Sequence, residues 1–225
     1  MKKHVLTTVD LSVKYGRRAA LDSVSLEVKN VGNIVGLFGP NGAGKTTLIR
    51  SVAGLIQSYK GTIHSPSSTS IAYLPDHPFL YKFLTINECV DLYRSLFKDF
   101  DSGRALDMLS DLSLGADLKI SECSKGMGEQ VHLALTLARR SSLYLLDEPL
   151  AAVDPLTRDV LIEMIQRRRH VGSTVILSTH LITGLDELFD ESVVVADGRL
   201  VLHEVIEDHI SLESKVKEVL SGNTV

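Results

Sequence analysis

Residues 34–47 of the chain read IVGLFGPNGAGKTT. The first five of them, 34–38, form a nearly continuous apolar run, which is typical of a strand buried on both faces of a parallel sheet. The glycine-rich segment 39–47 follows at once and fits G-x-x-x-x-G-K-[ST], and a helix is expected over residues 46–55. A buried strand, a glycine-rich loop and a helix in this order predict an α/β fold.

The glycine-rich segment is a predicted phosphate-binding loop. Glycines let the backbone wrap closely, so that several N–H groups converge on phosphate oxygens at the start of a helix. Lys45 is expected to reach the β- and γ-phosphates of a nucleotide, and the Thr46 hydroxyl is expected to bind Mg²⁺. A chance glycine turn would not explain the strand before it and the helix after it. The predicted phosphate-binding residues are Gly39, Pro40, Asn41, Gly42, Ala43, Gly44, Lys45, Thr46 and Thr47.

A second apolar strand, residues 143–146, ends in the acids Asp147 and Glu148 about 100 residues beyond the loop. At the carboxyl edge of a parallel sheet these acids would lie beside the phosphate loop. Asp147 is expected to hold Mg²⁺ through water, and Glu148 is expected to polarise the attacking water as a general base. Any strand can end in an acidic turn, so the acidic pair indicates a nucleotide site only in combination with the phosphate loop.

The rest of the chain divides by its periodicity. Residues 5–28 alternate apolar and polar side chains, which indicates antiparallel β structure. From Thr85 to about Arg140 the pattern becomes helical, starting with a capping box at Thr85 and Glu88. Strand patterns return at 143–146 and 174–177, Asp154-Pro155 starts a helix, residues 192–203 form a hairpin, and 207–220 form a final amphipathic helix.

The segment Cys123-Ser124-Lys125-Gly126-Met127, which opens a predicted helix, narrows the class of nucleotide-binding protein. With the two motifs above, the chain resembles the ATP-binding-cassette (ABC) ATPases, and Ser124 to Met127 resembles the signature of many bacterial exporter ATPases. The resemblance covers about residues 5–203. It implies a P-loop NTPase core with a RecA-like parallel sheet, an N-terminal antiparallel β subdomain and an inserted α-helical subdomain.

The resemblance also implies one nucleotide-binding domain over residues 1–225. Its ATP-binding core would take about residues 1–84 and 141–205, its helical signature subdomain about 85–140, and its C-terminal helix about 206–225.

Four further residues take family roles by their positions. Tyr15 resembles the aromatic that stacks on adenine, and Asp76 occupies the Q-loop position. Asp154 ends the D-loop-like residues 151–154, and His180 resembles the switch histidine that senses the γ-phosphate. Without the family context, Tyr15 reads as a strand-face tyrosine, His180 as an ordinary polar residue and Asp154 as a helix N-cap.

In the family, Ser124 and the backbone of Gly126 contact ATP that is bound to the opposing subunit. One chain would then hold half of each active site, and hydrolysis would need a head-to-tail dimer, either a homodimer or a heterodimer. ATP would close this dimer, and hydrolysis with phosphate release would let it open.

Asp76 departs from the family, which usually has glutamine at the Q-loop position. Aspartate adds negative charge beside the triphosphate, and it is one methylene shorter than glutamine. Asp76 would either coordinate Mg²⁺ more strongly or repel the phosphates and slow the cycle. Activity is expected to be retained, because Lys45, Asp147, Glu148 and His180 are all present.

The composition and the charge set limits on partners. The net charge of −4 gives no overall basic field for nucleic acid. Cys89 and Cys123 have no metal-ligand partners nearby and are expected to be reduced thiols. The basic N-terminus is followed by no long apolar region, and no stretch approaches the roughly 20 apolar residues of a membrane helix. Together with the resemblance to ABC ATPases, this implies a cytoplasmic protein that associates peripherally with the membrane.

Six of the twelve aromatic residues fall between Phe79 and Phe100. They could pack the helical subdomain, but the run from Phe79 to Phe83 follows the Q-loop position, where transport ATPases receive their membrane partner. We expect separate transmembrane permease subunits to dock there. The resemblance favours an exporter; the alternatives are a nucleic-acid clamp or translation-type factor, and a regulatory cassette with weak turnover.

Overall fold

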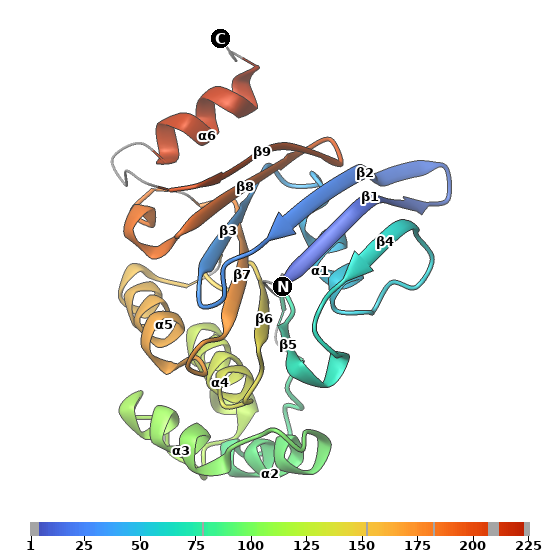
Figure 1. The fold of residues 1–225 in the computed structure, drawn as a ribbon. Coiled ribbons are helices and arrows are strands. Elements are labelled where there is room, and N and C mark those ends of the chain that lie inside the picture. The colour runs from blue at the N-terminus through green and yellow to red at the C-terminus, as the bar shows by residue number, and fades with distance from the viewer. Residues whose placement is uncertain (1–4, 78, 152, 182, 207–211, 223–225) are drawn as a thin grey trace.

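Two β-sheets lie on either side of helix α1 (Lys45–Val52) (Figure 1). The computed structural model describes residues 5–77, 79–151, 153–181, 183–206 and 212–222. The smaller sheet is antiparallel in the order β2-β1-β4. Its strands are β1 (Leu6–Tyr15), β2 (Arg18–Val28) and β4 (Lys60–His64).

The larger sheet has six strands in the order β5-β6-β7-β3-β8-β9. All neighbours are parallel except β8 and β9, which form an antiparallel hairpin. The strands are β3 (Ile34–Phe38), β5 (Ile71–Leu74), β6 (Leu143–Asp147), β7 (Thr174–Thr179), β8 (Glu191–Ala196) and β9 (Arg199–Val205).

The register of three neighbouring strands positions the site. Phe38 of β3 pairs with Thr179 of β7, and Asp147 of β6 pairs with Ser178 of β7. The carboxyl ends of β6, β7 and β3 therefore meet at one edge of the sheet, which is where ligands bind in α/β folds.

The described residues form five more α-helices: α2 (Ile86–Leu96), α3 (Ser102–Asp111), α4 (Lys125–Leu137), α5 (Pro155–Arg168) and α6 (Leu212–Ser221). Side chains of β3 alternate between two hydrophobic cores, as the period of a strand requires. Ile34 and Phe38 pack in the core beneath α2 to α5, whereas Val35 and Leu37 pack in the core shared with α1 and the antiparallel sheet. The completely apolar strand is therefore buried on both faces, as predicted.

Local signals in the sequence mark several element boundaries correctly. The Thr85–Glu88 capping box is present, and the Asp154 side chain caps α5 by accepting from Leu156 N and Thr157 N. Helix α1 ends at Val52 rather than Leu55, because Gly54 takes a left-handed φ of 77°. Of the predicted final helix, residues 207–211 lie outside the described part of the chain. The proposed subdomain boundaries near residues 84 and 140 remain predictions.

Two elements, β4 and α3, were not predicted. Four of the five residues of β4 are exposed and the fifth is half-buried, so the strand lacks the apolar alternation that identifies a half-buried strand. Helix α3 is short and buries only Ala105, Met108 and Leu109. Its N-cap is Asp101, whose side chain accepts from Arg104 N.

Helix α4 carries an unusual buried histidine. His132 has an exposed fraction of 0%, and neither ring nitrogen has a hydrogen-bond partner among the described residues. Its ring meets the Phe79 ring edge-on, with 4.9 Å between the ring centroids. Burial lowers the pKa of His132 to about 4. At this position the His132 ring packs within the fold.

Replacing His132 by leucine is expected to stabilise the fold. At pH 7 the change removes two unsatisfied ring nitrogens, which is worth about 1–3 kcal/mol in the free energy of unfolding. Between pH 6.5 and 4 the unfolded wild-type chain binds a proton at His132 that the folded chain excludes, so wild-type stability falls as the pH falls. The leucine variant has no imidazole to protonate at this position. Its gain in the free energy of unfolding over the wild type should therefore be about 2 kcal/mol larger at pH 5 than at pH 7.

Urea unfolding followed by circular dichroism at pH 7 and pH 5 measures both effects. The exposed His64 provides the control, because His64→Leu leaves the buried ring in place and should keep the wild-type pH dependence. An equal advantage of His132→Leu at the two pH values would contradict the assignment.

Candidate functional site

The glycine-rich loop is packed between the backbones of two strands. A Cβ atom on Gly39 would lie 2.1 Å from the Val195 carbonyl oxygen of β8, and Gly39 has a φ of 148°. A Cβ atom on Gly44 would lie 2.6 Å from the Ala20 carbonyl oxygen of β2. Both positions therefore require glycine. The loop is therefore held tightly between the two sheets, at the amino end of α1.

A cavity of about 440 Å³ opens above this loop. It combines the amino end of a helix with cationic side chains, an arrangement suited to phosphates. Its walls are Tyr15, Arg18, Ala20, Pro40, Asn41, Gly42, Ala43, Gly44, Lys45, Thr46, Thr47, Asp76 and Glu148. The structure thus brings together ten of the residues predicted to bind nucleotide, among them Tyr15 from β1 and Asp76 from beyond β5, together with Glu148.

Glu148 lies between a lysine and a histidine. Its Oε1 is 3.3 Å from Lys45 Nζ, and its Oε2 is 2.9 Å from His180 Nδ1. Lys45 Nζ also donates to the carbonyl oxygens of Gly39 at 2.7 Å and Pro40 at 3.3 Å. The three predicted catalytic side chains therefore form one connected group at the meeting point of β3, β6 and β7.

The backbone fixes Glu148 in place. Its φ of 50° is left-handed, and its N–H group donates to both the side chain and the carbonyl oxygen of Ser178. Such a conformation is uncommon for a residue other than glycine and persists where the surroundings determine it. Here it turns the chain sharply after β6, so that the carboxylate of Glu148 points to Lys45.

The two carboxylate oxygens of Asp147 differ in their hydrogen bonding. Its Oδ1 accepts from Ser178 Oγ at 2.6 Å and from Thr46 Oγ1 at 3.1 Å. Its Oδ2 is buried and has no hydrogen-bond partner within the described ranges. Burial raises the pKa of Asp147, because the charged carboxylate loses its hydration. A hard divalent cation beside Thr46 and Asp147 would satisfy the orphaned oxygen, so these side chains fit Mg²⁺.

No group of three or more histidine, cysteine or acidic side chains suited to a metal occurs in the described residues. This does not conflict with Mg²⁺, which commonly uses one or two protein oxygens and completes its shell with water and phosphates.

The predicted signature residues form a second group, which does not line the cavity. Ser124 caps α4, and its Oγ accepts from Met127 N at 3.2 Å. A Cβ atom on Gly126 would lie 3.6 Å from Thr157 and 4.0 Å from Asp154 Oδ2, so the amino ends of α4 and α5 are adjacent. We call Ser124, Gly126 and Asp154 the signature group. Ala152, within the predicted D-loop, lies outside the described residues.

Three contributors to the site were missed in the sequence. Arg18 lines the cavity across the β1–β2 turn from Tyr15, and Ser178 holds both Asp147 and the backbone of Glu148. Arg50 of α1 contacts Asp76. The only available signal for Ser178 was its place next to Thr179-His180 at the end of an apolar strand.

Three aromatic side chains between β5 and α2 are exposed: Phe79 by 63%, Tyr81 by 56% and Phe83 by 73%. The Tyr81 and Phe83 rings lie 5.5 Å apart. We call these three residues the aromatic patch. Leu80 within this run and Leu84 just after it are half-buried and pack against the hydrophobic core beneath α2 to α5.

Comparisons with known proteins agree with this geometry. Residues 21–151 match the family model described as ABC transporter. The chain is 30% identical to the ABC-type transporter ATP-binding protein EcsA of Bacillus subtilis, over 87% of this chain and 85% of that protein. It is 27% identical to the lantibiotic transport ATP-binding protein SrtF of Streptococcus pyogenes, over 93% of this chain and 94% of that protein.

Solved structures show the same fold. The structure titled as the ATP binding subunit of an ABC transporter has a TM-score of 0.85 at 26% identity, covering 96% of this chain and 99% of that one. A nucleotide-free ATP-binding cassette has a TM-score of 0.79 at 22% identity, covering 96% and 98%.

Proposed function

This chain belongs to the ABC transporter family as an ATP-binding subunit, and we propose that it hydrolyses Mg-ATP within a head-to-tail pair of cassettes to power an exporter. The observation that carries this proposal is the group formed by Lys45, Glu148 and His180 beside the phosphate loop. Binding alone would not need a carboxylate held between two nitrogen-bearing side chains at the mouth of the loop.

Each residue has a role in the proposed hydrolysis. The loop N–H groups and Lys45 hold the phosphates, and Tyr15 stacks on the adenine. Thr46 and Asp147 hold Mg²⁺, which supplies charge neutralisation on the phosphates when it is bound. Asp76, which lines the cavity wall, is the third proposed ligand of this ion.

Glu148 accepts the proton of the attacking water as the water oxygen bonds to the γ-phosphorus and the bond to the bridging oxygen of ADP breaks. In the proposed mechanism His180 orients the Glu148 carboxylate through the 2.9 Å contact and senses the γ-phosphate. Lys45 is 3.3 Å from the other carboxylate oxygen, so arriving phosphates compete with Glu148 for its ammonium group. This competition would free the carboxylate for water only when nucleotide is present.

The signature group supports the proposed dimer. Ser124 and Gly126 do not line the cavity of their own chain, although the family resemblance assigns them to ATP. The Ser124 oxygen accepts the helix-capping hydrogen bond, which leaves its hydroxyl proton available for a phosphate oxygen of a second cassette. The second cassette would be another copy of this chain or a related subunit.

A membrane partner must supply the transport path. Among the residues that the structure describes, no helix is both long and apolar enough to cross a membrane. The aromatic patch is a candidate dock for separate permease subunits, because exposed aromatic clusters are typical of protein interfaces. The chain would then associate with the cytoplasmic face of the membrane. The role in lantibiotic transport that SrtF is named for favours export.

Glutamate at both Phe79 and Phe83 is expected to reduce recovery of the chain with its membrane subunit by about tenfold or more, because two aromatic anchors are lost and charges are buried in their place. Detergent co-purification from cells measures this, with phosphate release by the purified chain as the test that the site is intact. Val171→Glu is the matched control, since Val171 is 93% exposed elsewhere on the surface. Undiminished co-purification would rule out this dock.

A regulatory cassette with weak turnover is the second candidate, because Asp76 adds charge at the Q-loop position. Phosphate release by the unmodified chain distinguishes it from the ATPase. Co-purification with nucleic acid in place of a multi-helix membrane protein would instead favour a nucleic-acid clamp.

A further inference from the structure

Asp76 is paired with a cationic side chain of α1. Asp76 lines the nucleotide cavity, and its Oδ1 lies 3.5 Å from Nη2 of Arg50. The Nε group of Arg50 donates to Tyr73 Oη at 3.3 Å. A tyrosine of β5 therefore orients the guanidinium group that meets Asp76.

Arg50 approaches Asp76 from the helix that also carries a predicted metal ligand. Thr46 and Arg50 are four residues apart on α1 (Lys45–Val52), so they project from the same face of the helix. The Arg50–Asp76 pair is thus next to the Thr46–Asp147 contact. His77 Nε2 lies 3.9 Å from Asp76 Oδ2, and its side chain is 87% exposed.

The Arg50–Asp76 pair lies in a site with an excess of negative charge. Asp76, Asp147 and Glu148 bring three carboxylates to a site for an anionic ligand, whereas a cassette with glutamine at the Q-loop position has one fewer. Both partners of the pair are about one-third to two-fifths exposed, so their attraction adds little to fold stability. Its effect is on the position and the net charge of the Asp76 carboxylate.

We propose that Arg50 is a positioning residue of the nucleotide site, which holds and neutralises Asp76 so that an aspartate can replace the glutamine without repelling the phosphates. Arginine suits this role because its Nε and Nη2 groups serve two different acceptors at once, which the single ammonium group of lysine cannot do. The inference rests on the proposed nucleotide site, and it concerns a residue outside the motifs that define that site.

A double-mutant cycle tests this role of Arg50 by measuring ATP affinity instead of the rate of hydrolysis. The full chain carrying Glu148→Gln is the parent, so that hydrolysis does not disturb the measurement. Fluorescence titration with a labelled ATP analogue and Mg²⁺ gives the dissociation constants of the parent, Arg50→Gln, Asp76→Gln and the double variant. Melting temperatures of all four report the fold.

Arg50→Gln should weaken binding about tenfold or more, because it leaves the Asp76 charge without its partner. The same change in the Asp76→Gln background should cost less than about twofold, since no charge remains to be neutralised. An equal loss in both backgrounds would overturn the inference and assign Arg50 to the nucleotide or to α1 itself. No loss from Arg50→Gln would overturn it as well.

Arg50→Lys gives an independent comparison if the glutamine variant does not fold. Lysine keeps the charge and loses one of the two contacts, so the ATP affinity of this variant should lie between those of the parent and Arg50→Gln. In the Asp76→Gln background the change to lysine should have no effect on affinity. A loss of affinity in that background would contradict the proposal. A parent chain that fails to bind ATP would overturn the proposed function itself, whereas binding by the parent with additive losses overturns only the role of Arg50.

Discussion

Replacing Glu148 by glutamine is expected to lower the rate of ATP hydrolysis by about 10²–10⁴-fold and to leave ATP binding intact, because an amide cannot accept the proton of the attacking water. The side chain is only 15% exposed and meets Lys45 and His180 through different oxygens. Glutamine has the same length and can keep either contact, so the loss would report the chemistry of the carboxylate.

The fold should tolerate this replacement. The left-handed φ of Glu148 is maintained by backbone hydrogen bonds to Ser178, which glutamine retains. Removing one negative charge beside Lys45 should also leave that ammonium group more available to phosphates. ATP affinity of the variant is therefore expected to equal or exceed that of the wild type.

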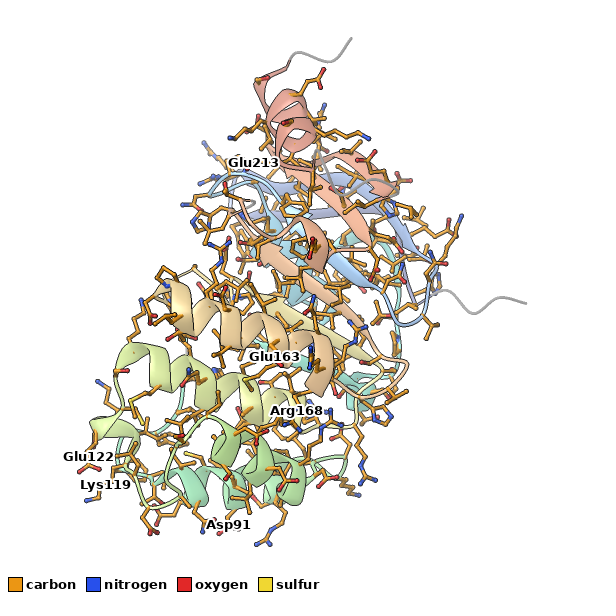
Figure 2. All side chains as sticks on the ribbon, turned by 90° about the vertical axis from the view of Figure 1, so that its left-hand side faces the viewer. Asp91, Lys119, Glu122, Glu163, Arg168 and Glu213 are labelled. Atoms are coloured by element: carbon orange, nitrogen blue, oxygen red, sulfur yellow. The ribbon has the colours of Figure 1, made fainter. Side chains whose placement is uncertain are left out.

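Phosphate release and binding of a labelled ATP analogue, measured on the same preparation, separate these two effects. Glu163→Gln is the matched control: Glu163 lies on α5, on the face turned to the viewer in Figure 2, and does not line the nucleotide cavity. Its hydrolysis rate should stay at the wild-type value. A Glu148→Gln rate within twofold of wild type would remove Glu148 from the proposed mechanism.

The sequence predicts the phosphate loop and the acidic pair because each is local. Residues 39–47 need only a strand before them and a helix after them, and Asp147 and Glu148 need only the end of an apolar strand. Their meeting follows from parallel strands sharing a carboxyl edge, which the β6-β7-β3 order realises. Local pattern and sheet geometry together account for the predicted catalytic group.

Contacts between side chains of separate elements cannot be predicted from local sequence patterns. Arg50 lies within the predicted helix 46–55, and nothing in the sequence links it or Tyr73 to Asp76. Only the placement of α1 against β5 brings them to Asp76. The sequence thus shows a departure from the family at Asp76, and the structure shows that Arg50 contacts this residue.

The signature group lies apart from the cavity in its own chain, so a second copy of the chain would have to bring it to the nucleotide. If the site is completed by a second copy, Lys45→Ala and Gly126→Asp should each abolish ATP hydrolysis for different reasons. The first removes the cation of the phosphate loop. The second places a carboxylate beside Asp154, where it would repel the phosphates of ATP on the opposing chain.

An equimolar mixture of these two variants should recover activity, up to about a quarter of the wild-type rate. Half of the dimers would be mixed, and each mixed dimer would contain one site with both Lys45 and Gly126 intact. A Cβ atom at Gly126 has ordinary contact distances to Thr157, and none is within 4 Å at Gly128, so aspartate at either position should preserve α4. Gly128→Asp is the matched control and should hydrolyse ATP alone. If Gly126→Asp binds ATP but the mixture stays inactive, the two halves of the site do not come from two copies of this chain.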